Sequence, residues 1–248
     1  DDWTLAQRAE PQLRPADDDW LRRLASSLSR PSRGPGLHDL LRARRHGRVC
    51  IVVEDLTRHS PLPELLEAIM REIHHAGIAD ERVEVLVACG MHPPMTAEEL
   101  SDKLGAIATS LRVRCNPWDR PAEYVRVGEA EGAEVRVDRG LADADLRVVV
   151  SSVAPHLQAG FGGGYKMFLP GCASLSTIRE LHRRGLDRGL RQLVGLPAEQ
   201  NPMRQLIDAG GALVDQRHGA TFAVQYILDG NDRPAAFGCG EVLASHRM

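Results

Sequence analysis

Three short runs of consecutive apolar residues constrain the fold of this chain most strongly. They are GRVCIVVED (47–55), RVEVLVA (82–88) and DLRVVVSS (145–152), and each is rich in β-branched residues. Such runs are typical of strands buried on both faces of a parallel sheet, because a solvent-facing side would need alternating polar residues. The sequence therefore predicts a parallel sheet covered on both sides.

Helical patterns separate these strands. PELLEAIMREIHHAGI (63–78) and NPMRQLIDAGGAL (201–213) have helical apolar spacing, and Thr96 with Glu99 forms a capping-box pattern before another helix. SLRVRC (110–115) and AEVRV (133–137) are weaker strand candidates, and 221–238 reads as a hairpin. We expect an α/β fold with a largely parallel sheet and helices on both faces, Rossmann-like. We expect a lead-in segment at 1–47, with one helix in 17–29, and an α/β domain at 48–248.

Composition excludes several classes of function. The chain has 248 residues, a net charge of −3 and a pI near 6.4, so it offers no electrostatic case for binding nucleic acid or an anionic membrane. No apolar run approaches the roughly 20 residues of a membrane span, and we expect a cytoplasmic location. Five scattered cysteines without a C-x-x-C pair argue against a disulfide framework and a thiolate zinc site, and Cys50 and Cys89, in or beside apolar runs, are expected to be buried.

The stretch FGGGYKMFLPG (161–171) places Lys166 behind the glycines Gly162, Gly163 and Gly164. Lysine is rare here, since Lys103 and Lys166 are the only two lysines among 31 basic residues. A primary amine can be deprotonated and acylated, whereas a guanidinium cannot, so Lys166 is a candidate for covalent chemistry. The alternative is an ordinary surface lysine. The stretch is not a Walker A loop, because Tyr165 and Met167 flank the lysine.

Unusual polar loops follow the three strongest strands. They are EDLTRHS (54–60), CGMHPPM (89–95) and APHLQAGFGGGYK (154–166). Ligands of open parallel sheets bind at the carboxyl ends of the strands, so Arg58, His92, His156 and Lys166 are expected to converge there. Each has a plainer interpretation: Arg58 as a partner of Asp55, the two loop histidines as solvated side chains, and His182 as a half-buried helix residue.

Four segments, taken together, resemble the lactate racemase family of nickel-pincer nucleotide enzymes. They are EDLTRHSP, CGMHPPMTAEE, APHLQAGFGGGYKMFLPGCASLSTIRELH and NPMRQLIDAGG, in this order. The resemblance runs from about Arg14 to the end of the chain. Members of the family carry a second, C-terminal domain, and this chain ends at about the point where that domain would begin. His59, Ser60 and Pro93 differ from the usual family residues, and these differences bear on the choice of substrate.

The resemblance implies a function and a role for each candidate residue. The family racemises or epimerises 2-hydroxy acids with a nicotinate-derived mononucleotide that holds nickel and is tethered to a lysine, here Lys166, by maturation enzymes. His182 would complete the nickel coordination, His92 and His156 would be the catalytic bases, and Arg58 would grip the substrate carboxylate. Asp55, Thr57 and the three glycines would bind the cofactor.

The implied reaction passes through a planar 2-keto acid. One histidine takes the hydroxyl proton while hydride moves from the α-carbon to the cofactor, and hydride return to either face gives both enantiomers. An alternative of another class is a non-catalytic module that holds a nucleotide or anion in the glycine loop. Two separate histidines favour the enzyme, because an anion binder has no use for them.

Overall fold

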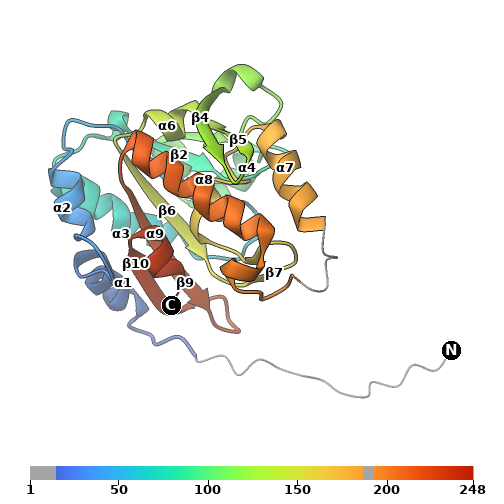
Figure 1. The fold of residues 1–248 in the computed structure, drawn as a ribbon. Helices are drawn as coiled ribbons and strands as arrows, with labels where there is room; N and C mark the ends of the chain where they lie inside the picture. Colours follow the sequence, from blue (N-terminus) through green and yellow to red (C-terminus); the bar gives the residue numbers. More distant parts are fainter. Residues whose placement is uncertain (1–14, 187–192, 248) are drawn as a thin grey trace, which may run out of the picture.

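A computed structural model describes residues 15–186 and 193–247, and its centre is a six-stranded sheet in the order β10-β9-β6-β1-β2-β3 (Figure 1). All neighbouring strands are parallel except β9 and β10, which form an antiparallel hairpin. The largely parallel sheet and the terminal hairpin predicted from the sequence are therefore confirmed. The strands are β1 (Val49–Val53), β2 (Val83–Val87), β3 (Arg112–Cys115), β6 (Leu146–Ser152), β9 (Thr221–Leu228) and β10 (Pro234–Gly240).

Helices from the first half of the chain cover one face of the sheet. They are α1 (Trp20–Ser29), α2 (Leu37–Arg42), α3 (Leu62–His75), α4 (Ala97–Leu104) and the short α5 (Ile107–Ser110). Val49, Ile51 and Val53 of β1 point into this layer. The predicted capping box at the start of α4 is present, because Thr96 accepts from Glu99 N–H and Glu99 accepts from Thr96 N–H.

The other face is covered mainly by the second half of the chain. Its helices are α6 (Arg139–Asp143), α7 (Leu175–Leu186), α8 (Pro202–His218) and α9 (Val242–His246). Cys50 and Val52 of β1 point toward this layer, so alternate residues of one strand are buried on opposite faces. This two-sided burial explains why the parallel strands are continuously apolar.

Two small hairpins lie outside the main sheet. β4 (Tyr124–Ala130) pairs antiparallel with β5 (Ala133–Asp138), so the weak candidate at 133–137 is a strand but not a member of the parallel sheet. β7 (Pro155–His156) pairs with β8 (Gly160–Phe161) and leads into the 3-10 turn η3 (Gly164–Met167), which carries Lys166. The described residues also form the 3-10 turns η1 (Asp80–Arg82), η2 (Pro121–Glu123) and η5 (Ala198–Gln200).

The segment expected to lead into the domain packs on it wherever it is described. Leu24 and Leu28 of α1 and Leu37 and Leu41 of α2 are buried in the same core as α3. The division at residue 47 stays a prediction, and residues 1–14 lie outside the described part. Within residues 15–186 and 193–247, no helix has the length and apolarity to cross a membrane.

Candidate active site

A cavity of about 370 Å³ opens at the carboxyl ends of β1, β2 and β6. Nearly all the predicted site residues line it: Asp55, Thr57, Arg58, His92, His156, Gly162, Gly163, Lys166 and His182. The exception is Gly164, which lies behind the cavity with its N–H bound to Gln225. These residues come from four separate segments, the loops 54–60, 89–95 and 154–166 and helix α7, and the three loops meet at one edge of the sheet, as the strand-end rule predicts.

Asp55 and His92 form a hydrogen-bonded pair at the mouth of the cavity. Asp55 follows β1, His92 follows β2, and the Asp55 Oδ2 to His92 Nδ1 distance is 2.6 Å. The other carboxylate oxygen, Oδ1, accepts from the N–H and hydroxyl of Thr57. Burial opposes ionisation of Asp55, but the hydrogen bonds from Thr57 and His92 outweigh it and lower its pKa. An ionised Asp55 fixes the His92 proton on Nδ1 and leaves Nε2 free to accept another.

His156 has the opposite arrangement of its ring nitrogens. Its Nδ1 accepts from the backbone N–H groups of Gln158 (3.2 Å) and Ala159 (3.1 Å), so the neutral ring carries its proton on Nε2. Burial lowers the pKa of His156 to about 3, and the nearby Lys166 and Arg58 charges act in the same direction. His156 is therefore a neutral hydrogen-bond donor through Nε2, whereas His92 has an acceptor nitrogen to offer.

The guanidinium of Arg58 does not form an ion pair with the Asp55 carboxylate, although the Arg58 backbone N–H donates to the Asp55 carbonyl at 3.4 Å. Its Nη1 donates to the carbonyl of Thr57 at 3.0 Å, and its own carbonyl accepts from Lys103 Nζ. Lys103, on α4, is a buried side chain rather than a surface lysine and holds the loop after β1 in place. Arg58 keeps further N–H groups for an anion, and a guanidinium binds a carboxylate with two parallel hydrogen bonds.

Lys166 and His182 approach the cavity from η3 and α7, respectively. Burial, followed by the charges of Arg58 and Arg204, lowers the pKa of Lys166 to about 8, so a larger fraction of this amine is uncharged near neutral pH than of an ordinary lysine. Burial, followed by the Lys166 charge, also lowers the pKa of His182. The amine is thus suited to nucleophilic attack on an acyl group, and the neutral imidazole to metal binding.

The positions in the glycine loop differ in how strictly they require glycine. Gly163 has φ +75° and ψ −174°, a conformation confined almost to glycine, and an added Cβ would lie 2.7 Å from Gln225 Oε1. Gly162 has no positive φ, and its added Cβ would make only an ordinary contact at 3.6 Å. Gly163 is thus a structural requirement of the loop.

Substitution of Gly163 by alanine is expected to lower the free energy of unfolding by about 1–3 kcal/mol, because the backbone is strained and the Cβ clashes. Gly162→Ala is the matched control and is expected to cost less than about 1 kcal/mol. Urea denaturation of both variants measures the difference. Equal losses of unfolding free energy in the two variants would show that the loop does not require glycine at position 163.

The sequence did not reveal several residues that line or support the cavity. Glu54 is buried on its floor and accepts from Ser152 N–H (2.8 Å), Ser152 Oγ (2.6 Å), Ser60 Oγ (2.5 Å) and Tyr226 OH (3.2 Å). Its place directly after a buried strand was the one available signal. Cys89, Gln158, Met167, Ile178 and Met203 also line the cavity. The expectation that Cys50 and Cys89 are buried is confirmed.

The donor set fits a metal held within an organic cofactor better than one held by protein ligands alone. In the described ranges, no three His, Cys, Asp or Glu side chains are grouped to hold a metal ion. The cavity instead offers the His182 imidazole, the Lys166 amine and two glycines whose backbone a flat or phosphorylated ligand can approach closely. The residues present therefore fit a lysine-tethered nickel nucleotide with His182 as a metal ligand.

The structure defines an α/β domain with a cavity at the carboxyl edge of its sheet, lined by three histidines, an arginine and a lysine among other residues. Residues 1–191 match the family model of the lactate racemase N-terminal domain, so the chain belongs to this family. It is similar to the lactate racemases of Lactiplantibacillus plantarum (26% identical over 224 residues, 90% of this chain) and Thermoanaerobacterium thermosaccharolyticum (29% over 214 residues, 84%).

Solved structures with the same fold include the lactate racemase apoprotein of T. thermosaccharolyticum, with a TM-score of 0.82 and 23% identity over 92% of this chain and 53% of that one. A Thermotoga maritima protein gives a TM-score of 0.73 at 21% identity, covering 92% and 55% of the two chains. The chain also covers only 51% and 47% of the two curated racemases, so it spans about half of their length.

Proposed function

We propose that this chain is the cofactor-binding part of a racemase or epimerase that acts on a 2-hydroxy acid. The observation that carries the proposal is the meeting of Arg58, His92, His156, Lys166 and His182 in one cavity. Membership of the lactate racemase family and the similarity to two lactate racemases support it. The maturation enzymes of the cofactor would be its protein partners, and a cytoplasmic location stays a prediction.

Each side chain has a task in this reaction. Arg58 binds the carboxylate of the substrate and so orients the hydroxyl-bearing carbon. His92, held by Asp55, accepts the hydroxyl proton at Nε2. His156 donates its Nε2–H to the oxygen of the substrate and stabilises the negative charge that develops there. The resemblance implies that both histidines are catalytic bases, one on each side of the substrate, and the hydrogen bonds favour a different neutral tautomer for each.

Lys166 would tether the cofactor and His182 would bind its nickel. When bound, a nickel-pincer nucleotide supplies the hydride acceptor for oxidation of the α-carbon. The thioamide tether that the resemblance implies would need an amine, because the uncharged amine attacks an activated thioacyl carbon, displaces the activating group and loses a proton. The lowered pKa of Lys166 places more of the amine in this form near neutral pH.

Covalent loading at Lys166 is the experiment that tests this proposal. The protein is produced together with the maturation enzymes and examined by intact mass, peptide mapping and nickel analysis. We expect a mass gain on the Lys166 peptide together with nickel, and neither in Lys166→Arg, which keeps the charge but cannot be acylated in this way. A parent protein that stays unmodified, while a known lactate racemase is loaded in parallel, would contradict the proposal.

A further inference from the structure

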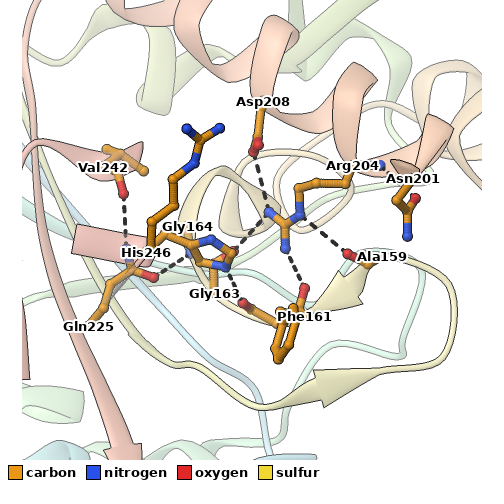
Figure 2. Close-up of polar contacts among 12 residues, drawn as sticks. Ala159, Phe161, Gly163, Gly164, Asn201, Arg204, Asp208, Gln225, Val242 and His246 are labelled. Atoms are coloured by element: carbon orange, nitrogen blue, oxygen red, sulfur yellow. Dashed lines mark hydrogen bonds and ion pairs between the residues drawn. The ribbon is translucent and has the colours of Figure 1, made fainter. Parts of the chain in front are cut away.

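The glycine loop is held from behind by side chains that come much later in the chain. Figure 2 shows Arg204, Gln225 and His246, which we call the loop clamp, around residues 159–164. Their hydrogen bonds join Arg204 Nε to Ala159 O (3.3 Å), Arg204 Nη2 to Phe161 O, Arg204 Nη1 to Gly163 O (3.5 Å), His246 Nε2 to Gly162 O (2.7 Å) and Gly164 N to Gln225 Oε1 (2.7 Å).

Arg204 is the centre of the clamp. It lies in the first turn of α8, only 2% exposed, and its fork reaches three carbonyls of the loop. Asp208, one turn further along α8, is 3.4 Å from Nη1 and balances the charge. Burying a guanidinium is costly unless its N–H groups are satisfied, and a lysine ammonium cannot span three separated carbonyls. Arginine therefore suits this position, because its planar guanidinium can donate to three carbonyls of the loop at once while Asp208 balances its charge.

Gln225 and His246 complete the clamp from β9 and α9. The Gln225 side-chain amide accepts from Gly164 N–H and donates to Val242 O (3.1 Å) and Ser245 Oγ (2.9 Å), so it ties the loop to α9. The His246 ring faces Gly164, where an added Cβ would lie 3.0 Å from it. Burial lowers the pKa of His246 to about 4, and the neutral ring donates Nε2–H to Gly162 O.

The loop lines the cavity, whereas the residues of the loop clamp do not. Gly162, Gly163 and Lys166 line the cavity, whereas Arg204, Gln225 and His246 do not. The carbonyls of Phe161, Gly162 and Gly163 are therefore drawn toward the clamp. Lys166 follows two residues after the last clamped peptide group and donates its own N–H to Gly163 O (3.2 Å). The place of the amine thus depends on the conformation that the clamp imposes.

We propose that Arg204, assisted by Gln225 and His246, is a positioning residue that fixes the glycine loop and so sets where the Lys166 amine enters the cavity. The proposal rests on the proposed function only for the role of Lys166 as the attachment point. It assigns to residues 204–246, far along the chain, a direct influence on the loading of a site built by earlier segments. The effect of the loop clamp on the position of the Lys166 amine is distinct from its effect on the stability of the whole domain.

A matched arginine makes the test specific. Arg147 is also fully buried and also donates to backbone carbonyls, those of Leu141, Ala144 and His218, but it lies at the start of β6, at the opposite end from the cavity. Arg204→Met and Arg147→Met are both expected to lower the melting temperature. Only Arg204→Met is expected to speed amide hydrogen exchange in residues 160–167, by at least roughly tenfold, because only it frees this loop.

The second readout is the fraction of protein loaded at Lys166 during production with the maturation enzymes. We expect a severalfold fall in Arg204→Met and no change in Arg147→Met at a temperature where both are folded. Exchange in 160–167 that stays at the parent rate, or that rises equally in both variants, would overturn the proposal. If no chain is loaded, including the parent, the proposed function fails, and hydrogen exchange alone still decides the role of Arg204.

His246→Phe keeps the test decisive if Arg204→Met does not fold. Phenylalanine preserves the ring against Gly164 but removes the donor to Gly162 O. Faster exchange at 160–167 than in the parent, while protected amides elsewhere keep the parent rate, is the expected result. Unchanged exchange in His246→Phe would overturn the clamp.

Discussion

Replacement of Asp55 by asparagine is expected to lower the racemisation rate of the loaded protein by roughly 10²–10⁴-fold. The Oδ1 position accepts two hydrogen bonds from Thr57, so the amide oxygen of asparagine must stay there. The amide NH₂ then faces His92 Nδ1 and forces the ring proton onto Nε2. His92 loses the lone pair that would take the hydroxyl proton, although nearly all the shape of the site is kept.

A second Asp–His pair in the chain provides the control for this variant. Asp80 lies 2.7 Å from His74 on the exposed surface, away from the cavity. Asp80→Asn is expected to leave the racemisation rate unchanged. Nitrogen-15 NMR of the ring should report the proton of His92 on Nδ1 in the parent and on Nε2 in Asp55→Asn. A parent-like rate in Asp55→Asn would show that His92 is not the proton acceptor.

Replacement of His182 by alanine is expected to separate the metal from the organic part of the cofactor. Loss of a second-shell partner alone lowers metal affinity 10–100-fold, so loss of a direct ligand should cost more than about 100-fold. The Lys166 adduct should remain in the intact mass, whereas nickel analysis should find little metal. His75→Ala, an exposed histidine on α3, is the control. Full nickel retention in His182→Ala would remove His182 from the ligand set.

The elements that the sequence predicted best are those whose burial is uniform. β1, β2 and β6 are buried on both faces, so their apolar runs indicate strands at the centre of a parallel sheet. β5 alternates exposed and buried residues, and its local pattern cannot tell whether it joins the main sheet or a separate hairpin with β4. The β7–β8 hairpin has two residues in each strand, too few for a periodic signal.

The site was predicted in part because its residues follow strands. Arg58, His92, His156 and Lys166 lie in loops at the carboxyl ends of strands, and parallel topology brings such ends together. The ring nitrogen that carries the proton on each histidine was not predictable from the sequence. It depends on Asp55 for His92 and on two backbone N–H groups for His156. Glu54, Lys103 and Arg204 act through contacts across the fold. Glu54 has one local signal, its place directly after a buried strand, and no local pattern marks Lys103 or Arg204.

Conversion of an enantiopure 2-hydroxy acid is the most direct test of the proposed activity. Protein whose loading at Lys166 has been established is incubated with single enantiomers of lactate, malate and a sugar acid, and optical purity is followed by chiral chromatography. We predict loss of optical purity for at least one acid from either enantiomer, and none with Lys166→Arg. Retention of optical purity by the loaded protein in every case would contradict racemase activity and favour a module that binds its nucleotide without catalysis.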